Sequence, residues 1–304
     1  MVKDFDLNGG IQKLLERSVS RVPKEIIKKL SGLTDYHKKT NNFRVISQLE
    51  LMKENLEYTQ STGLPNCQDT GIPTFFIRAG LKSPFLFGLE SEIKKAIQNC
   101  TERGILRPNS VDPLNEQNPG DNLGVNTPPF YYELTNSDSI ILSVVNKSGG
   151  AENYSALFML NPSTGLKLME EKIINRIKEA GGKPCPPIIV GIGIGGDAVK
   201  CMYLAKKALL RPVGTHHERA DVAEIEQRLF EKINALDIGV MGLGGIGTCL
   251  AVHCEIAMRH PASFPVGMIV QCYSHRVQSI EISSNGSIKY GHLDANFNFI
   301  TEED

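Results

Sequence analysis

The chain has 304 residues, a formal net charge of -1 and a hydrophobic share of 41%. This length allows a substantial buried core, and the near-zero charge excludes the strongly basic surface of a general nucleic-acid-binding protein. No apolar run reaches the roughly 18–20 residues of a membrane-spanning helix, and the first residues contain acids and no apolar stretch. We therefore expect a cytoplasmic protein with neither a nucleic-acid nor a membrane partner.

Apolar periodicity predicts the elements in chain order. Helices are expected within residues 10–60, with a second one starting near Pro23 and a third over 42–57, and then over 91–100 and 166–180. Strands are expected over 74–80, 130–134 and 140–145. A long irregular stretch covers 104–129, and structureless loops of such length are often functional.

The C-terminal third contains two similar segments, residues 184–210 and 236–260. Each is predicted to run from an apolar strand through a glycine turn into a helix. A last strand over 264–273 is expected to precede a polar tail. The fold class predicted is α/β (mixed α+β), with small mixed sheets surrounded by helices and an N-terminal helical segment. Residues 1–304 are expected to form one compact domain.

The glycine segments 191–196 and 242–247 both have the spacing G-x-G-x-x-G. Each is expected to precede a helix whose N-terminal amides could receive an anion. Dinucleotide binding would also require an acidic residue about 20 positions later at a strand end, and Glu218 has no such context. Close packing of helix on strand, without any ligand, is the alternative.

Seven cysteines are present, an odd number that argues against a complete disulfide framework. Four of them are expected to be small buried apolar groups on predicted helices: Cys100, Cys201, Cys249 and Cys254. The other three, Cys67, Cys185 and Cys272, fall at the ends of predicted elements, where side chains are available for function. The sequence contains no CxxC pair, the arrangement that usually binds structural zinc, so a zinc site is not favoured. A [4Fe-4S] cluster held by three cysteines would leave one iron open as a Lewis acid, which suits hydration or dehydration.

Several motifs resemble, in the same order, those of the α subunit or N-terminal domain of class I fumarases and the related L-tartrate dehydratases. They include CQDTG (67–71), LRPNSVDP (106–113), NLGVNTPP (122–129), KSGGAEN (147–153), PCPPIIVGIGIGG (184–196), ALLRPVG (208–214), GVMGLGGIGTCLAV (239–252) and HPASFPVGMIVQC (260–272). Each motif alone is weak, whereas the ordered set is specific. It covers nearly the whole chain beyond the first helices.

The resemblance implies one [4Fe-4S] cluster per chain, with Cys67, Cys185 and Cys272 as its ligands. It also implies that a small dicarboxylate is bound by the following residues: Gln68, Asp69, Arg107, Lys147, Gly149 and Gly150. Of these, Gln68, Asp69 and Arg107 are the catalytic candidates. Further active-site groups would come from a separate β subunit, in a heterotetramer or a higher dimer of heterodimers.

The substrate implied by the resemblance is fumarate or tartrate. The segments KxGGxEN and MGLGG look more like fumarase, which would place the enzyme in the tricarboxylic acid cycle. Ser148, Ala151 and Leu123 depart from the common pattern. Fumarate hydratase is therefore the expected activity, and L(+)-tartrate dehydratase is the alternative. A nicotinamide-dependent oxidoreductase and a non-catalytic scaffold are hypotheses from other classes.

Several candidate residues could instead have a purely structural role. Arg107 could be a solvated loop residue, Asp69 could serve an Asx turn, and Lys147 could be an exposed lysine. His275 and Arg276 follow Cys272 closely and could line a cluster pocket. His253 and His260 are expected on or at the end of the last predicted helix.

Overall fold

The structure is a computed structural model and describes residues 6–302. The chain forms two compact units, each built from separated segments. The first unit comprises the described parts of Met1–Val22, Leu56–Ser148 and Arg276–Asp304. The second comprises Pro23–Asn55 and Gly149–His275. The predicted fold class, mixed α and β with small mixed sheets and N-terminal helices, is confirmed. Among the described helices, none has the length and apolar character needed to cross a membrane.

The first unit contains a six-stranded sheet in the order β10-β9-β8-β3-β1-β2. Only β1 and β2 pair in parallel, and the other neighbours are antiparallel. Its elements are α1 (Leu7–Ser20), β1 (Ile72–Gly80), α4 (Leu89–Glu102), β2 (Phe130–Thr135), β3 (Ile140–Lys147), β8 (Val277–Ile282), β9 (Ile288–Leu293) and β10 (Phe299–Thr301).

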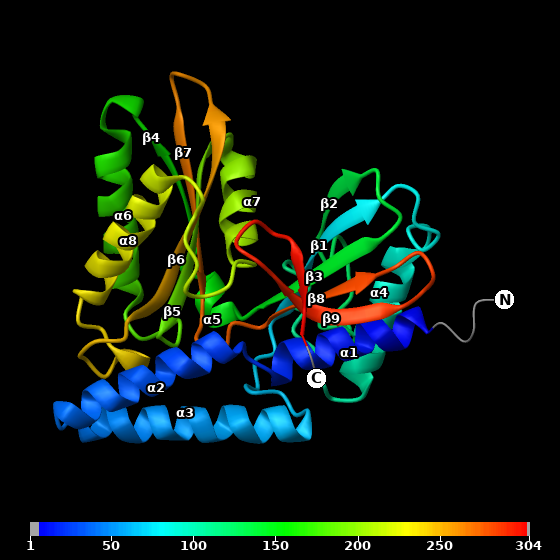
Figure 1. The fold of residues 1–304 in the computed structure, drawn as a ribbon, viewed down its shortest axis with the longest axis horizontal. Coiled ribbons are helices and arrows are strands. Elements are labelled where there is room, and N and C mark those ends of the chain that lie inside the picture. The colour runs from blue at the N-terminus through cyan, green and yellow to red at the C-terminus, as the bar shows by residue number, and fades with distance from the viewer. Residues whose placement is uncertain (1–5, 303–304) are drawn as a thin grey trace. The chain divides into compact units, whose positions relative to one another are not determined.

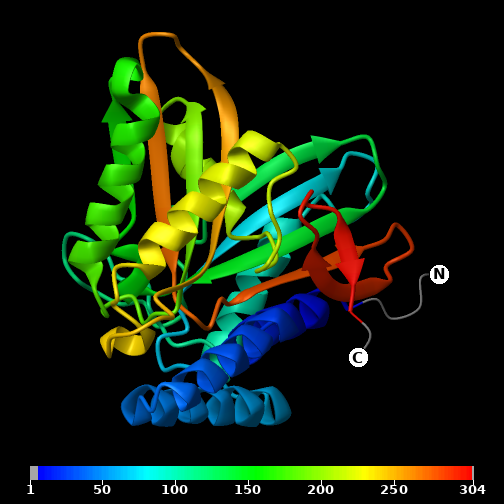
Figure 2. The ribbon, with the colours of Figure 1, turned by 60° about the vertical axis from the view of Figure 1, so that its left-hand side comes forward.

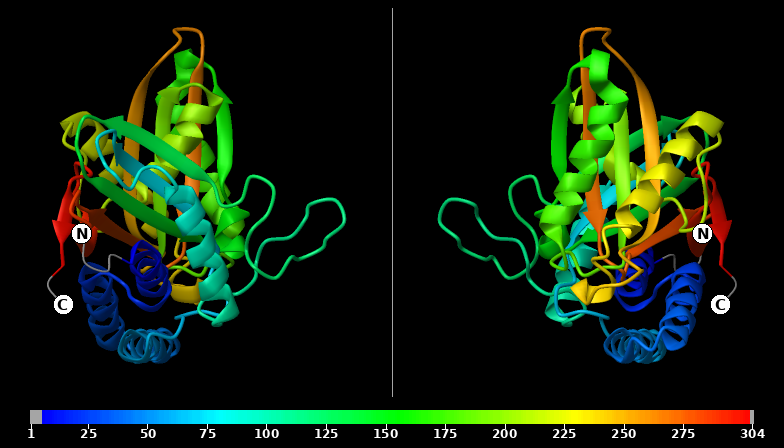
Figure 3. Two further views of the ribbon diagram at one scale, coloured as in Figure 1. Left: turned by 90° about the vertical axis from the view of Figure 1, so that its right-hand side faces the viewer. Right: turned by 90° about the vertical axis from the view of Figure 1, so that its left-hand side faces the viewer.

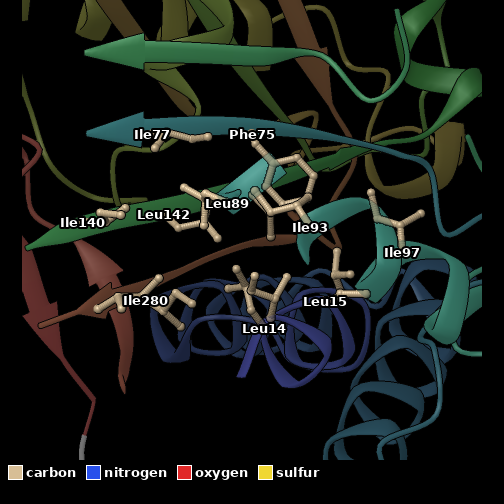
Figure 4. Close-up of a cluster of buried hydrophobic side chains, with 14 of the residues drawn as sticks. Leu14, Leu15, Phe75, Ile77, Leu89, Ile93, Ile97, Ile140, Leu142 and Ile280 are labelled. Atoms are coloured by element: carbon tan, nitrogen blue, oxygen red, sulfur yellow. The ribbon is translucent and has the colours of Figure 1, made fainter. Parts of the chain in front are cut away.

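Helices α1 and α4 bury their apolar stripes against this sheet, as Figure 4 shows. The side chains of Leu14 and Leu15 on α1 meet Ile93 and Ile97 on α4, and all four are fully buried. Phe75 of β1 lies in the same cluster. Burying one such side chain contributes about 1.5–3 kcal/mol. The core therefore fixes the strand ends that carry the candidate site.

The second unit contains a four-stranded sheet in the order β4-β7-β5-β6, in which only β5 and β6 run parallel. Helices α6 and α8 cover one face of the sheet, and α7 covers the other (Figures 1 and 2). The elements are α2 (Lys24–Lys39), α5 (Gly149–Glu152), β4 (Ala156–Leu160), α6 (Gly165–Ala180), β5 (Ile188–Gly196), α7 (Ala198–Ala208), α8 (Ala220–Asn234), β6 (Cys249–Arg259) and β7 (Phe264–Gln271). Of helix α3 (Phe43–Thr62), the residues up to Asn55 belong to the second unit and those from Leu56 to the first.

The second glycine segment does not lead into a helix, so that prediction is wrong. Residues 249–259 form strand β6 instead. Ala, Leu, Glu and Met in this stretch favour a helix locally. Pairing with β5 along most of its length overrides that preference, because both partners gain a full ladder of backbone hydrogen bonds. Cys249, His253 and Cys254 therefore lie on a strand, and His260 directly follows it.

The expected polar tail is also structured, because β8, β9 and β10 all follow Cys272. Strand β8 pairs with β3 near the middle of the first sheet. Its six residues, VQSIEI, place polar side chains among apolar ones, and such a short run gives a weak strand signal. Helix α8 and strand β4 were likewise not predicted from the sequence.

The first glycine segment does form a strand followed by a helix, as predicted. Gly193 lies inside β5, where a Cβ atom would come 2.0 Å from the carbonyl oxygen of Cys201 in α7. Close helix–strand packing therefore accounts for this glycine. At the start of α7, the Asp197 carboxylate already accepts a hydrogen bond of 2.7 Å from Lys200 N. The N-terminus of α7, where an anion was expected to bind, is therefore capped by the carboxylate of Asp197.

Replacing Gly193 with alanine is expected to destabilise the protein by about 1–3 kcal/mol, because the added methyl group overpacks the contact with α7. Gly32→Ala is the matched control. Gly32 lies inside α2 with open space around it, so this change is expected to add about 0.5–1 kcal/mol of stability. Denaturant unfolding measures both free energies. Equal effects of the two substitutions would contradict the packing role of Gly193.

Candidate active site

In the first unit, the CQDTG turn follows α3 and leads into β1. Asn66 N donates a 2.9 Å hydrogen bond to Val19 O, which ties the start of the turn to the end of α1. The Asp69 side chain accepts from Gly71 N at 3.0 Å. This is the Asx turn that the sequence offered as the structural interpretation of Asp69. The thiol of Cys67 is half-buried and the side chain of Gln68 is exposed.

Gly71 allows this turn to pack closely against the backbone at the end of β3. Its φ of +82° lies in the left-handed region, and an added Cβ would lie 2.7 Å from the carbonyl carbon of Lys147. Only glycine fits both conditions. Lys147 itself is 5% exposed. The interpretation of Lys147 as an exposed lysine is therefore wrong, and its buried position beside the turn agrees with a place in the site.

The start of the long loop after α4 is fastened to the same turn. Arg107 N donates to Thr70 Oγ1 at 3.0 Å, and Asn109 Nδ2 donates to Asp69 Oδ1 at 3.3 Å and to Gly71 O at 3.2 Å. The Arg107 side chain is exposed, as its solvated-loop interpretation required, and is available to an anion. Sequence reasoning did not single out Asn109, although it lies inside the LRPN motif.

In the second unit, two cysteine segments lie side by side. Cys185 is exposed on the loop between α6 and β5, with a φ of +57°, and Cys272 directly follows β7 and is 4% exposed. Tyr273 N donates to Cys185 O at 3.4 Å, which joins the two segments. The Sγ atom of Cys272 lies 3.1 Å from Ser274 Oγ.

The second glycine segment supports the Cys185 loop. Met241 N donates a 2.8 Å hydrogen bond to Pro186 O, one residue after the cysteine. Residues 242–247 therefore belong to a segment that supports the Cys185 loop, which gives it a structural role instead of the nucleotide-binding role suggested by its glycine spacing. The exposed glycines Gly149 and Gly150 begin the short helix α5, and a Cβ on Gly150 would lie 3.4 Å from Lys183 O. They therefore lie beside the same loop.

The remaining four cysteines are buried, as expected. Desolvation raises the pKa of the Cys100 and Cys249 thiols to about 12 and also raises the pKa of Cys201 and Cys254. A thiolate is the form that binds metal or attacks an electrophile, so burial keeps these four groups inert. The burial of these four follows the sequence prediction, whereas of the other three Cys272 is buried too, Cys67 is half-buried and Cys185 is exposed.

His275 lies close to Cys272, since His275 N donates to Cys272 O at 3.1 Å. Burial lowers the pKa of His275 to about 4, so the imidazole is neutral at pH 7. Arg276 belongs to the first unit, where Arg276 O accepts from Asn146 N at 3.0 Å. Both side chains are buried. Their suggested place beside a cluster stays a prediction.

The structure thus assembles two groups of candidate residues, one in each unit. The first unit holds Cys67, Gln68, Asp69, Arg107 and Lys147, and the second holds Cys185, Cys272, Gly149 and Gly150. Across residues 6–302, no set of three or more His, Cys, Asp or Glu side chains is arranged to hold a metal ion. A site with three cysteine ligands stays a prediction.

The sequence matches a profile of the fumarate hydratase (Fumerase) family over residues 9–281. The chain belongs to this family. The recognition of a class I fumarase or tartrate dehydratase α-type chain is confirmed, and so is the prediction of a hydro-lyase.

Several named proteins are similar to the chain over most of its length. A protein of Methanocaldococcus jannaschii, provisionally named L(+)-tartrate dehydratase subunit alpha, is 42% identical over 250 residues, which are 81% of this chain and 88% of that protein. The L(+)-tartrate dehydratase subunit alpha of Escherichia coli strain UTI89 is 32% identical over 267 residues, 88% of this chain and 87% of its own. The protein of that name from strain K12 is 33% identical over 84% of each chain.

Alkylation of the metal-free native protein with iodoacetamide near pH 8 should label Cys185 first, because its thiol is exposed and the other six are half-buried or buried. Cys100, Cys249 and Cys254 should resist, since burial leaves almost no thiolate on groups with such raised pKa values. Peptide mass spectrometry measures the extent at each site, and urea-unfolded protein, in which all seven should react, is the control. Early labelling of Cys249 would contradict this description.

Proposed function

We propose that this chain is the α subunit of an iron–sulfur L(+)-tartrate dehydratase. The observation that carries the proposal is the similarity to proteins named as α subunits of that enzyme, at up to 42% identity over most of both chains. The reaction removes water from tartrate. A hydroxyl leaves one central carbon, a proton leaves the other, and the resulting enol becomes oxaloacetate. No net oxidation or reduction occurs, and no electron carrier is consumed.

The cluster ligands we propose are Cys67, Cys185 and Cys272. Their positions support this choice, because each lies in a connection between elements and outside the group of four cysteines whose pKa values burial raises. Two of them lie on neighbouring segments of the second unit. A bound [4Fe-4S] cluster with three thiolate ligands supplies one open iron as a Lewis acid for the departing hydroxyl.

Residues of the first unit would handle the substrate. The exposed Arg107 guanidinium suits a carboxylate, which it can bind in a bidentate, charge-assisted way. Negative charge grows on that carboxylate as the proton leaves the neighbouring carbon, so this contact stabilises the transition state more than the ground state. We assign Asp69 to proton transfer or to orienting the substrate together with Gln68. Lys147 would offset the negative charge of the substrate and the cluster ligands.

The second unit and a partner would complete the site. The exposed backbone of Gly149 and Gly150, beside the Cys185 loop, allows close approach of substrate. We propose that both units of residues 1–304 act as one α-type functional domain. Because the relatives are called subunit alpha, we further propose a separate β subunit that supplies the remaining active-site groups, in a heterotetramer or a higher dimer of heterodimers.

Fumarate hydratase, which the sequence motifs favoured, is the second candidate. The description of the matching family supports it. The named relatives support tartrate dehydratase better, so the order of the two candidates is reversed from the sequence-based expectation. The two reactions share the removal of a hydroxyl and a neighbouring proton, and therefore need the same type of site.

Substrate preference is tested by purifying the chain with its partner subunit under anaerobic conditions and assaying L(+)-tartrate, malate and fumarate side by side. We expect kcat/KM for tartrate to exceed that for malate or fumarate by about 10-fold or more, since a site that hydrogen-bonds a hydroxyl rejects an analogue lacking it. A preference for fumarate and malate would replace the proposal with its second candidate. Inactivity on all three acids in iron-loaded protein would reject both.

The ligand assignment predicts that Cys67→Ser, Cys185→Ser and Cys272→Ser each lower bound iron and sulfide after anaerobic reconstitution, and each abolish dehydratase activity. Cys201→Ala is the matched control, since Cys201 is buried in α7 and should keep its iron and activity. Iron analysis and the visible absorption of the cluster give readouts that do not depend on turnover. Full iron content in any of the three serine variants would remove that cysteine from the ligand set.

A further inference from the structure

Two asparagines link the candidate residues of the first unit to the buried face of helix α4. Asn122 is 0% exposed and stands in the long loop between α4 and β2, the loop that projects from the first sheet in Figure 3. Its Nδ2 donates to Thr101 Oγ1 at 3.0 Å and to Arg107 O at 2.8 Å. Its Oδ1 accepts from Asn109 N at 2.6 Å.

Asn109 carries this link on to the CQDTG turn. Its Nδ2 donates to both Asp69 Oδ1 and Gly71 O. A side-chain amide nitrogen has two hydrogens, so both are used at the turn. Asp69 Oδ1 receives a second donor, Gly71 N. One oxygen of this carboxylate is thereby held by two N–H groups, which fixes its direction.

The same link sets the spacing between the two substrate-handling segments. Asn122 holds Arg107 through its backbone carbonyl and holds Asp69 through Asn109, and it is itself anchored on Thr101 of α4. A loop of this length would otherwise let Arg107 and Asp69 move independently. The helix packs firmly in the first core, because Ile93, Ile97 and Cys100 are fully buried.

We propose that Asn109 is a positioning residue that orients the Asp69 carboxylate toward substrate, and that Asn122 holds Asn109 and the Arg107 segment at a fixed distance from α4. This inference rests on the proposed function to the extent that Asp69 and Arg107 act on a dicarboxylate. The amide of Asn109 is the essential group, because it donates where a carboxylate of the same shape could only accept.

Substitution at Asn109 separates its hydrogen bonds from its volume. In the cluster-loaded enzyme with its partner, Asn109→Ala should lower kcat about 10-fold and Asn109→Asp about 100-fold, because small displacements of a reacting group cost rate steeply. The KM should change by less than about threefold, since Arg107 still binds the carboxylate. A residue that only filled space would give the opposite order, with the isosteric aspartate better tolerated than alanine.

Asn118 provides the matched control in the same loop. Its Nδ2 donates to Pro108 O at 2.9 Å and its Oδ1 accepts from Gly120 N at 2.8 Å, with no bond to Asp69 among those found for it. Asn118→Ala and Asn118→Asp should keep kcat within about twofold of the parent enzyme. Equal losses at positions 109 and 118, or an Asn109→Asp enzyme as active as the parent, would overturn the inference.

A stability measurement tests the link without turnover. Asp69→Asn and Asn109→Asp should each lower the melting temperature of the full chain. The double variant again places a donor opposite an acceptor between positions 69 and 109, while Gly71 O still lacks its donor. Its loss should therefore be smaller than the sum of the two single losses. Additive losses would overturn the inference even if no dicarboxylate were turned over. If the stability coupling is present while the parent enzyme is inactive on every acid tested, the proposed function fails and the hydrogen-bonded link stands.

Discussion

The close approach of Gly71 to the backbone of Lys147 determines where the candidate site of the first unit can lie. A left-handed backbone and a contact too short for any side chain occur at the same residue. They press the cysteine-bearing turn onto the end of β3, and the Asx bond of Asp69 then closes the turn. Without that contact, Cys67 and Asp69 would sit on an ordinary connection after α3. The positions of these candidate side chains therefore depend on Gly71, a residue without a side chain.

Much of this arrangement was readable from the sequence, in particular where an element had a single strong signal. The strand at 74–80, the helix ending near Cys100 and the burial of the other four cysteines, which were set apart from Cys67, Cys185 and Cys272, agree with the structure. The failure at 249–259 has a physical cause. The residues there favour a helix locally but form a strand because they pair with β5. The two strands are about 60 residues apart in sequence, so no local pattern indicates their pairing.

The candidate site was predictable as residue types but not as a hydrogen-bonded assembly. CQDTG and LRPN identified Asp69 and Arg107, whereas the contact between the two motifs passes through Thr70 and Asn109. These hydrogen bonds depend on how the loop folds back onto the strand, and no residue spacing within a single sequence predicts them. Substrate preference was hard to read for a related reason. Malate and tartrate differ by one hydroxyl group. The motifs used to choose between them, KSGGAEN and MGLGG, are rich in glycine and contain few side chains that could recognise that hydroxyl.

The first unit is assembled from three stretches of chain, and β8, which lies between β3 and β9 in its sheet, comes from the last of them. A chain emerging from the ribosome exposes the α1, β1 and β3 stretches long before their partner strand is synthesised. During that interval the inner edge of β3 is open to mispairing with other nascent chains. The sheet that supports the cysteine-bearing turn is therefore complete only after residues 277–282 of β8 have been synthesised.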